Sequence, residues 1–128
     1  MDLGIKPVFK DDIQISDDMR SVFRDFMVNT GPYEWQMKCG VMLATGKQLL
    51  IIPAGFGKSR VLIAAAVHLS LKGIDVVVNM TNQSILERDS TEFEKVIHYN
   101  ESGMYGKTGD ITLRYIIEEV KGKKSIHV

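Results

Sequence analysis

The chain has 128 residues, the size of a single domain, and 45% of them are hydrophobic and 25% charged. These proportions argue against disorder along the whole chain, and 16 basic against 16 acidic residues argue against a strongly basic nucleic-acid module. The single cysteine excludes an internal disulfide and suits a reducing compartment. The first residues do not resemble a secretory signal, and the longest apolar stretch, residues 61–67, is much too short to span a bilayer. We therefore expect a cytoplasmic protein without a membrane span.

Two helices are predicted in the first third of the chain. Residues 1–14 show no clear period and are interpreted as an arm. Ser16 is a suitable N-cap for a helix whose apolar residues repeat at helical spacing, and the turn-forming residues 29–32 end it. A second helix should run from about Pro32 to Ala44, with Gly46 at its end.

The middle of the chain is predicted to form a strand, a helix and a second strand. The apolar run 49–52 is bounded by a glycine and a proline, which suits a strand buried on both faces. Residues 53–57 form a glycine-rich turn before a helix from Lys58 to Leu71. The β-branched residues of 74–78 predict another buried strand, and the crossover between the strands is long enough for parallel pairing.

The second half of the chain carries weaker signals. A helix is predicted from near Gln83 to Tyr99, followed by a loop over residues 100–109 that contains three glycines. Residues 111–120 fit either a strand or a helix, residues 121–124 a turn, and residues 125–128 the opening of another strand.

The strongest chemical signal lies between the first predicted strand and the helix that follows, where the sequence is Ala54-Gly55-Phe56-Gly57-Lys58-Ser59. The two glycines allow backbone N–H groups to face an anion, and the start of the helix adds a positive field. Lys58 would reach the β- and γ-phosphates of a nucleotide, and the Ser59 hydroxyl would hold Mg²⁺. Together with Arg60, these residues form the predicted nucleotide site, in which Ser59 is the metal ligand.

The phosphate loop departs from the usual P-loop pattern in two ways. Ile52 stands where that pattern has its first glycine, and Gly55 supplies a flexible position instead. No apolar strand is followed by the acidic pair that orients Mg²⁺ and the attacking water. The sequence therefore predicts a site that binds nucleotide without being hydrolytically complete, in a fragment or a degenerate relative of an ATPase.

The segment from Tyr33 to Arg60 resembles the first motor domain of superfamily 2 helicases and of the SecA preprotein translocase ATPases. The resemblance implies that Gln36, which lies 22 residues before Lys58, reads the adenine edge. The other interpretation is that Gln36 merely caps a helix contact on the surface. The family pattern differs at Pro53-Ala54, where it has a polar pair, and at Phe56, where it has an acidic or small residue.

A second stretch, residues 78–89, is similar to a motif of SecA-type ATPases. In that motif a strand ends in a short polar turn, and a leucine, a variable residue and an Arg-Asp pair open the helix that follows. Glu92 and Phe93 continue the likeness. RecQ-type and DEAD-box helicases also fit residues 54–59, but they lack the Leu-x-Arg-Asp feature found here at residues 86–89. Arg88 and Asp89 are interpreted either as part of a substrate-facing motif or as a charged pair that meets solvent.

The resemblance implies an α/β fold, namely part of a three-layer, RecA-like P-loop domain with a parallel sheet over residues 31–128. Residues 1–30 precede it as an N-terminal arm and helix. The function implied is that of the ATP-binding portion of a SecA-like or helicase-like motor, with ATP and Mg²⁺ as cofactors and a polypeptide as its candidate substrate. Two alternatives stay open. One is a nucleic-acid helicase fragment, which the neutral charge disfavours, and the other is a non-catalytic P-loop module that regulates a partner.

Overall fold

The computed structural model describes residues 13–27, 30–46, 58–80, 82–115 and 124–127. Its helices and strands follow the order α1 (Asp17–Phe26), α2 (Glu34–Thr45), α3 (Lys58–Leu71), β1 (Val76–Met80), α4 (Gln83–Glu92), α5 (Glu94–Ile97), the 3₁₀ helix η1 (Tyr99–Ser102), β2 (Ile111–Tyr115) and β3 (Lys124–His127). The predicted strand 49–52 and residues Ala54, Gly55, Phe56 and Gly57 of the phosphate loop lie outside the described residues.

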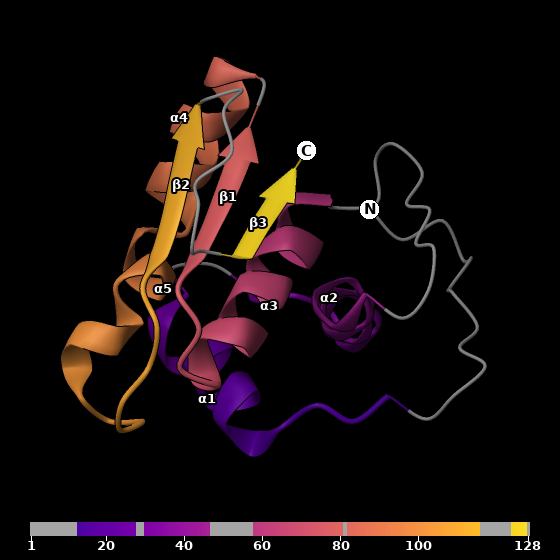
Figure 1. The fold of residues 1–128 in the computed structure, drawn as a ribbon, viewed down its shortest axis with the longest axis vertical. Helices are drawn as coiled ribbons and strands as arrows, with labels where there is room; N and C mark the ends of the chain where they lie inside the picture. Colours follow the sequence, from indigo (N-terminus) through magenta and orange to yellow (C-terminus); the bar gives the residue numbers. More distant parts are fainter. Residues whose placement is uncertain (1–12, 28–29, 47–57, 81, 116–123, 128) are drawn as a thin grey trace.

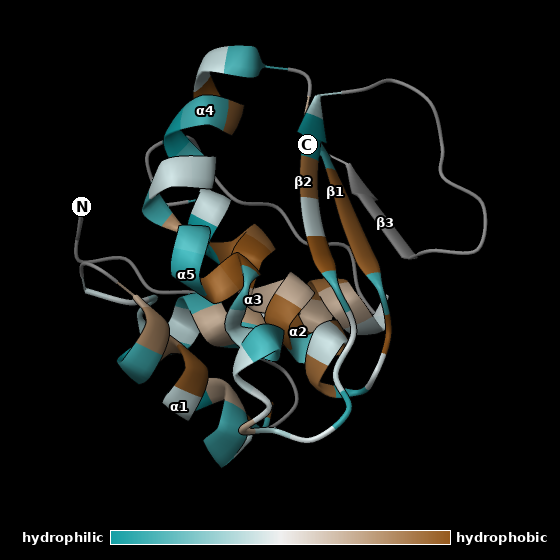
Figure 2. Cartoon of the chain, turned by 90° about the vertical axis from the view of Figure 1, so that its left-hand side faces the viewer, coloured by the Kyte–Doolittle hydropathy of each residue, from teal (hydrophilic) through white to brown (hydrophobic). Residues whose placement is uncertain are grey.

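The three described strands form a parallel sheet in the order β2-β1-β3. Val76 pairs with Ile111 on one side and with Lys124 on the other, so the strands start level with one another. The described helices all lie on one face of this sheet (Figures 1 and 2). The prediction of a mixed α/β fold with a parallel sheet is therefore confirmed, and the described residues form two layers.

Helix α3 is the centre of the hydrophobic core. All of its residues from 61 to 67 are buried, and Val76, Val78 and Met80 of β1 belong to the same apolar cluster. Helices α1 and α2 contribute Met19 and Met37 to the same cluster. Because α3 is covered all round, its sequence is apolar on every face, whereas only one side of α1 is apolar (Figure 2).

The capping signals of the first two helices are confirmed. The Ser16 side chain accepts a hydrogen bond from the Met19 backbone N–H at 3.2 Å, and α1 begins at the next residue, Asp17. Gly46 ends α2 with a φ of 65°, a left-handed conformation that glycine adopts without steric cost.

The predicted helix over residues 83–99 is divided in the structure. It consists of α4, α5 and η1, with a break at Phe93, where φ is −104° and ψ is 15°. Phe93, Val96 and Tyr99 are all buried and follow one another at intervals of three residues. Over six residues a continuous α-helix would turn Tyr99 by about 120° from Phe93, and the non-helical backbone at Phe93 and His98 lets both side chains reach the core.

Two strand boundaries also differ from the expectation. β1 begins at Val76 rather than at Ile74, which is 39% exposed. The segment that fitted either a strand or a helix forms a strand over residues 111–115, because its first residue pairs with Val76 in the parallel sheet.

Replacing Gly40 by alanine should destabilise the chain by about 1–3 kcal/mol, the usual cost of overpacking a core. Gly40 lies where α2 crosses α3. A Cβ atom there would be 2.7 Å from the Ala64 Cβ, 2.8 Å from the Ala65 backbone nitrogen and 2.9 Å from the Val61 carbonyl oxygen. In a helix without such neighbours, alanine would instead stabilise the fold by about 0.5–1 kcal/mol. The sign of the change in urea denaturation therefore tests the close packing of the two helices.

Candidate functional site

The first turn of α3 lies at the end of the sheet toward which the strands point (Figure 1). Lys58 opens this helix and its side chain is exposed, while Ser59 and Arg60 are half-buried. The chain passes from β1 to β2 on one side and returns to β3 on the other, so the strand order reverses between β1 and β3. In open parallel sheets, ligands bind at the carboxyl ends of the strands beside such a reversal.

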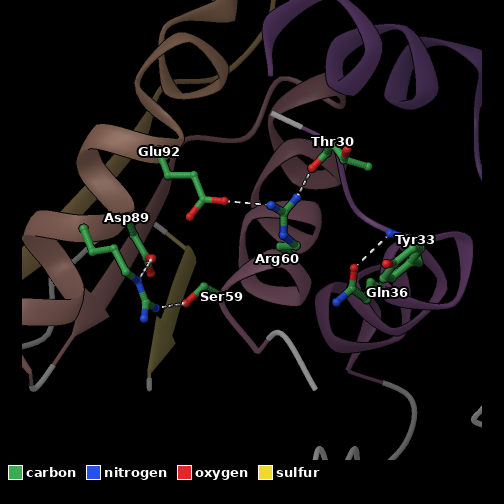
Figure 3. Close-up of polar contacts among 8 residues, drawn as sticks. Thr30, Tyr33, Gln36, Ser59, Arg60, Asp89 and Glu92 are labelled. Atoms are coloured by element: carbon green, nitrogen blue, oxygen red, sulfur yellow. Dashed lines mark hydrogen bonds and ion pairs between the residues drawn. The ribbon is translucent and has the colours of Figure 1, made fainter. Parts of the chain in front are cut away.

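Two polar contacts join the first turn of α3 to α4 (Figure 3). The Arg88 Nη2 group donates a hydrogen bond to the Ser59 hydroxyl oxygen at 3.1 Å, and the Arg60 Nη2 group lies 2.7 Å from the Glu92 carboxylate. Arg88 and Glu92 are one helical turn apart, so they present their groups from the same side of α4. These two contacts join Ser59 and Arg60, which are consecutive in α3, to one face of α4.

Asp89 is buried, with 1% of its side chain exposed. Its Oδ1 atom accepts a hydrogen bond from Arg88 Nε at 3.2 Å, and its Oδ2 atom has no hydrogen-bond partner within the described parts of the chain. The Arg88 side chain is 61% exposed. Of the two interpretations of this pair, solvation by water therefore describes the arginine and not the aspartate.

Arg60, a predicted nucleotide-binding residue, makes two structural contacts. Its guanidinium donates to the Thr30 carbonyl oxygen and to the Glu92 carboxylate, both shown in Figure 3. These contacts tie α3 to α4 and to the segment before α2. A contact between Arg60 and a nucleotide stays a prediction.

Gln36 is 3% exposed, and its Oε1 atom accepts a hydrogen bond from the Tyr33 backbone N–H at 2.8 Å (Figure 3). Gln36 is the third residue of α2, where a glutamine side chain often satisfies the backbone N–H of the residue that precedes the helix. The helix contact considered as the alternative role is thus present, but Gln36 makes it as a buried residue and not on the surface. Adenine recognition stays a prediction, and it requires that this oxygen be shared or released.

Sequence reasoning missed the way in which Ser59, Arg88 and Asp89 come together. Ser59 and Arg88 are 29 positions apart, so their contact depends on how α4 packs beside α3. The only signal was the Arg-Asp pair at residues 88 and 89, whose partner no local pattern could identify.

Two groups away from the site have a pKa that is shifted by burial. Burial raises the pKa of the Cys39 thiol, and burial together with nearby Lys72 lowers the pKa of His68. Within the described residues, no group of three or more His, Cys, Asp or Glu side chains is arranged to hold a metal ion. None of the described helices is both long enough and apolar enough to cross a membrane.

Comparison with known proteins gives no match, whether to a family model, to a curated protein or to a solved structure.

Proposed function

We propose that this chain binds ATP at residues Gly55–Ser59 and is the nucleotide-binding portion of a SecA-like or helicase-like motor. The observation that carries the proposal is the position of Lys58 and Ser59. They follow the sequence Gly55-Phe56-Gly57 directly, and they open a helix at the carboxyl end of a parallel sheet whose strand order reverses. This combination suits phosphate binding.

The electrostatics at the start of α3 favour an anion. A helix carries the equivalent of about half a positive charge at its first turn, where backbone N–H groups lack partners within the helix. α3 has 14 residues, enough to develop this dipole, and Lys58 adds a full charge at the same place. An ATP triphosphate would meet both.

The proposed Mg²⁺ ligand is the Ser59 hydroxyl. The oxygen atoms near it suit a hard cation. The Ser59 hydroxyl and the Asp89 carboxylate both contact the Arg88 guanidinium, so two oxygen ligands lie beside one positive charge. When bound, Mg²⁺ would supply charge neutralisation at the phosphates. The cytoplasm is the proposed compartment, since it provides ATP and keeps the buried Cys39 reduced.

The chain should release phosphate from ATP far more slowly than about 1 s⁻¹, the lower range of ordinary enzyme turnover. The carboxylates that reach the first turn of α3, Asp89 and Glu92, do so through arginines to which they are ion-paired. Arg60 engages Glu92 and Arg88 engages the Oδ1 atom of Asp89, so neither carboxylate is presented as the general base of a complete site. A phosphate-release assay on the purified chain checks this, and turnover at motor rates would show that another carboxylate acts.

ATP should bind more tightly than GTP, by roughly 5- to 150-fold if a buried amide that lacks its partner costs about 1–3 kcal/mol. Gln36 offers a donor and an acceptor to adenine, and guanine presents a carbonyl where adenine has its amino group. The Gln36→Ala substitution removes both groups, including the acceptor that distinguishes adenine's amino group from guanine's carbonyl, since N7 is common to the two bases. Calorimetry should show that this variant loses the preference. An equal preference in both proteins would mean that Gln36 does not read the base.

A further inference from the structure

We propose that the Arg88 guanidinium occupies the position of a divalent cation beside Ser59 and Asp89, and thereby sets how strongly nucleotide binding depends on Mg²⁺. The inference rests on the proposed function and concerns the metal at the same site. It is carried by the geometry of three side chains from α3 and α4 (Figure 3).

One edge of the guanidinium makes both contacts. Arg88 Nε donates to Asp89 Oδ1 at 3.2 Å, and Arg88 Nη2 donates to Ser59 Oγ at 3.1 Å. Nε and Nη2 share one edge of the planar group, so a hydroxyl oxygen and a carboxylate oxygen converge on a single positive charge. Hydroxyl and carboxylate oxygens are also the protein ligands that hold Mg²⁺ in phosphate-loop sites.

The second carboxylate oxygen points to a further ligand. Asp89 Oδ2 is buried and has no hydrogen-bond partner among the described residues, and an unpaired buried carboxylate oxygen is costly. A hydrated cation in place of the guanidinium would bring water molecules that could donate to this oxygen. Arg88 donates to Asp89 Oδ1 and not to Asp89 Oδ2.

Arg88 can leave this position without disturbing the core. Its side chain is 61% exposed, whereas only 1% of the Asp89 side chain is exposed. Rotation of the arginine into solvent would leave the Ser59 hydroxyl and the Asp89 carboxylate in place. Mg²⁺ and the guanidinium cannot both contact Ser59 Oγ and Asp89 Oδ1, so Mg²⁺ that enters with ATP must displace Arg88. The loss of the two Arg88 hydrogen bonds offsets part of the free energy that Mg²⁺ contributes to nucleotide binding.

The test compares the dissociation constant for ATP with Mg²⁺ present and with EDTA, measured by calorimetry on the wild type and on Arg88→Gln. Hydrogen bonds to charged groups contribute about 1.5–3 kcal/mol, so removing the competing guanidinium should raise the Mg²⁺ dependence by about tenfold or more. Arg20→Gln is the matched control. Arg20 is a half-exposed arginine of α1 whose carboxylate partner is Glu34, and this variant should keep the wild-type ratio.

Two results would overturn the inference while ATP binding stands. One is an unchanged Mg²⁺ dependence in Arg88→Gln. The other is an equal loss of ATP affinity with and without Mg²⁺, which would mean that Arg88 contacts the phosphates itself.

If neither the wild type nor the variants bind ATP, the proposed function fails. The inference is then tested by metal binding in the absence of nucleotide. Mn²⁺ binding followed by electron paramagnetic resonance would support it if Arg88→Gln binds the ion more tightly than the wild type and the added Asp89→Asn change abolishes this gain. Equal Mn²⁺ binding by Arg88→Gln and the wild type would overturn it.

Discussion

Replacing Gly109 by alanine should destabilise the chain by about 3 kcal/mol or more, at the upper end of what overpacking costs. A Cβ atom at this position would lie 2.0 Å from the carbonyl oxygen of Ile74, 2.2 Å from its carbonyl carbon and 2.8 Å from the backbone nitrogen of Asp75. All three are backbone atoms, so no side-chain rotation can relieve the overlap.

The surroundings of Gly109 cannot shift without a loss of hydrogen bonds. Its N–H donates to the Ser70 carbonyl oxygen at 2.8 Å, and the Val76 N–H donates to the Asp110 carbonyl oxygen, also at 2.8 Å. The Ser70 hydroxyl in turn lies 2.8 Å from the buried Tyr99 hydroxyl. Gly109 therefore holds the starts of β1 and β2 together, and moving it would disturb both strands.

Urea denaturation followed by circular dichroism measures this effect, with Gly103→Ala as the control. Gly103 has a φ of 70° and no atom within 4 Å of the added Cβ, so its substitution should cost only the conformational strain of about 1–2 kcal/mol. If Gly109→Ala proves no more destabilising than the control, the backbone of Ile74 does not lie as close to Gly109 as the structure places it.

The local parts of the fold could be predicted from the sequence. Ser16, Gly46 and the apolar run of α3 each act within a few residues, and the structure confirms the helices that they predict. The break at Phe93 could not be predicted, because it depends on the core that Phe93 and Tyr99 must reach from the same side.

The site divides in the same manner. Lys58 and Ser59 were found from the short sequence that contains them, and the structure places them at the start of α3. The link from Ser59 through Arg88 to Asp89 joins residues from two helices, and packing alone brings them together. The helix contact of Gln36 is local, and its signal was its place as the third residue of α2.

Replacing Lys58 by alanine should weaken ATP binding by more than about tenfold, which corresponds to about 1.4 kcal/mol. The change removes the charge that would meet the β- and γ-phosphates at the start of α3. Because the Lys58 side chain is exposed, the free energy of unfolding should stay near that of the wild type. Lys72→Ala is the matched control, since Lys72 is an exposed lysine just beyond the opposite end of α3.

Calorimetric titration of ATP into the wild type, Lys58→Ala and Lys72→Ala is the most direct test of nucleotide binding at this helix. The wild type and Lys72→Ala should bind ATP alike, and Lys58→Ala should bind it more than about tenfold more weakly. The account would be contradicted if the wild type binds no ATP, or if Lys58→Ala binds ATP as tightly as the wild type does.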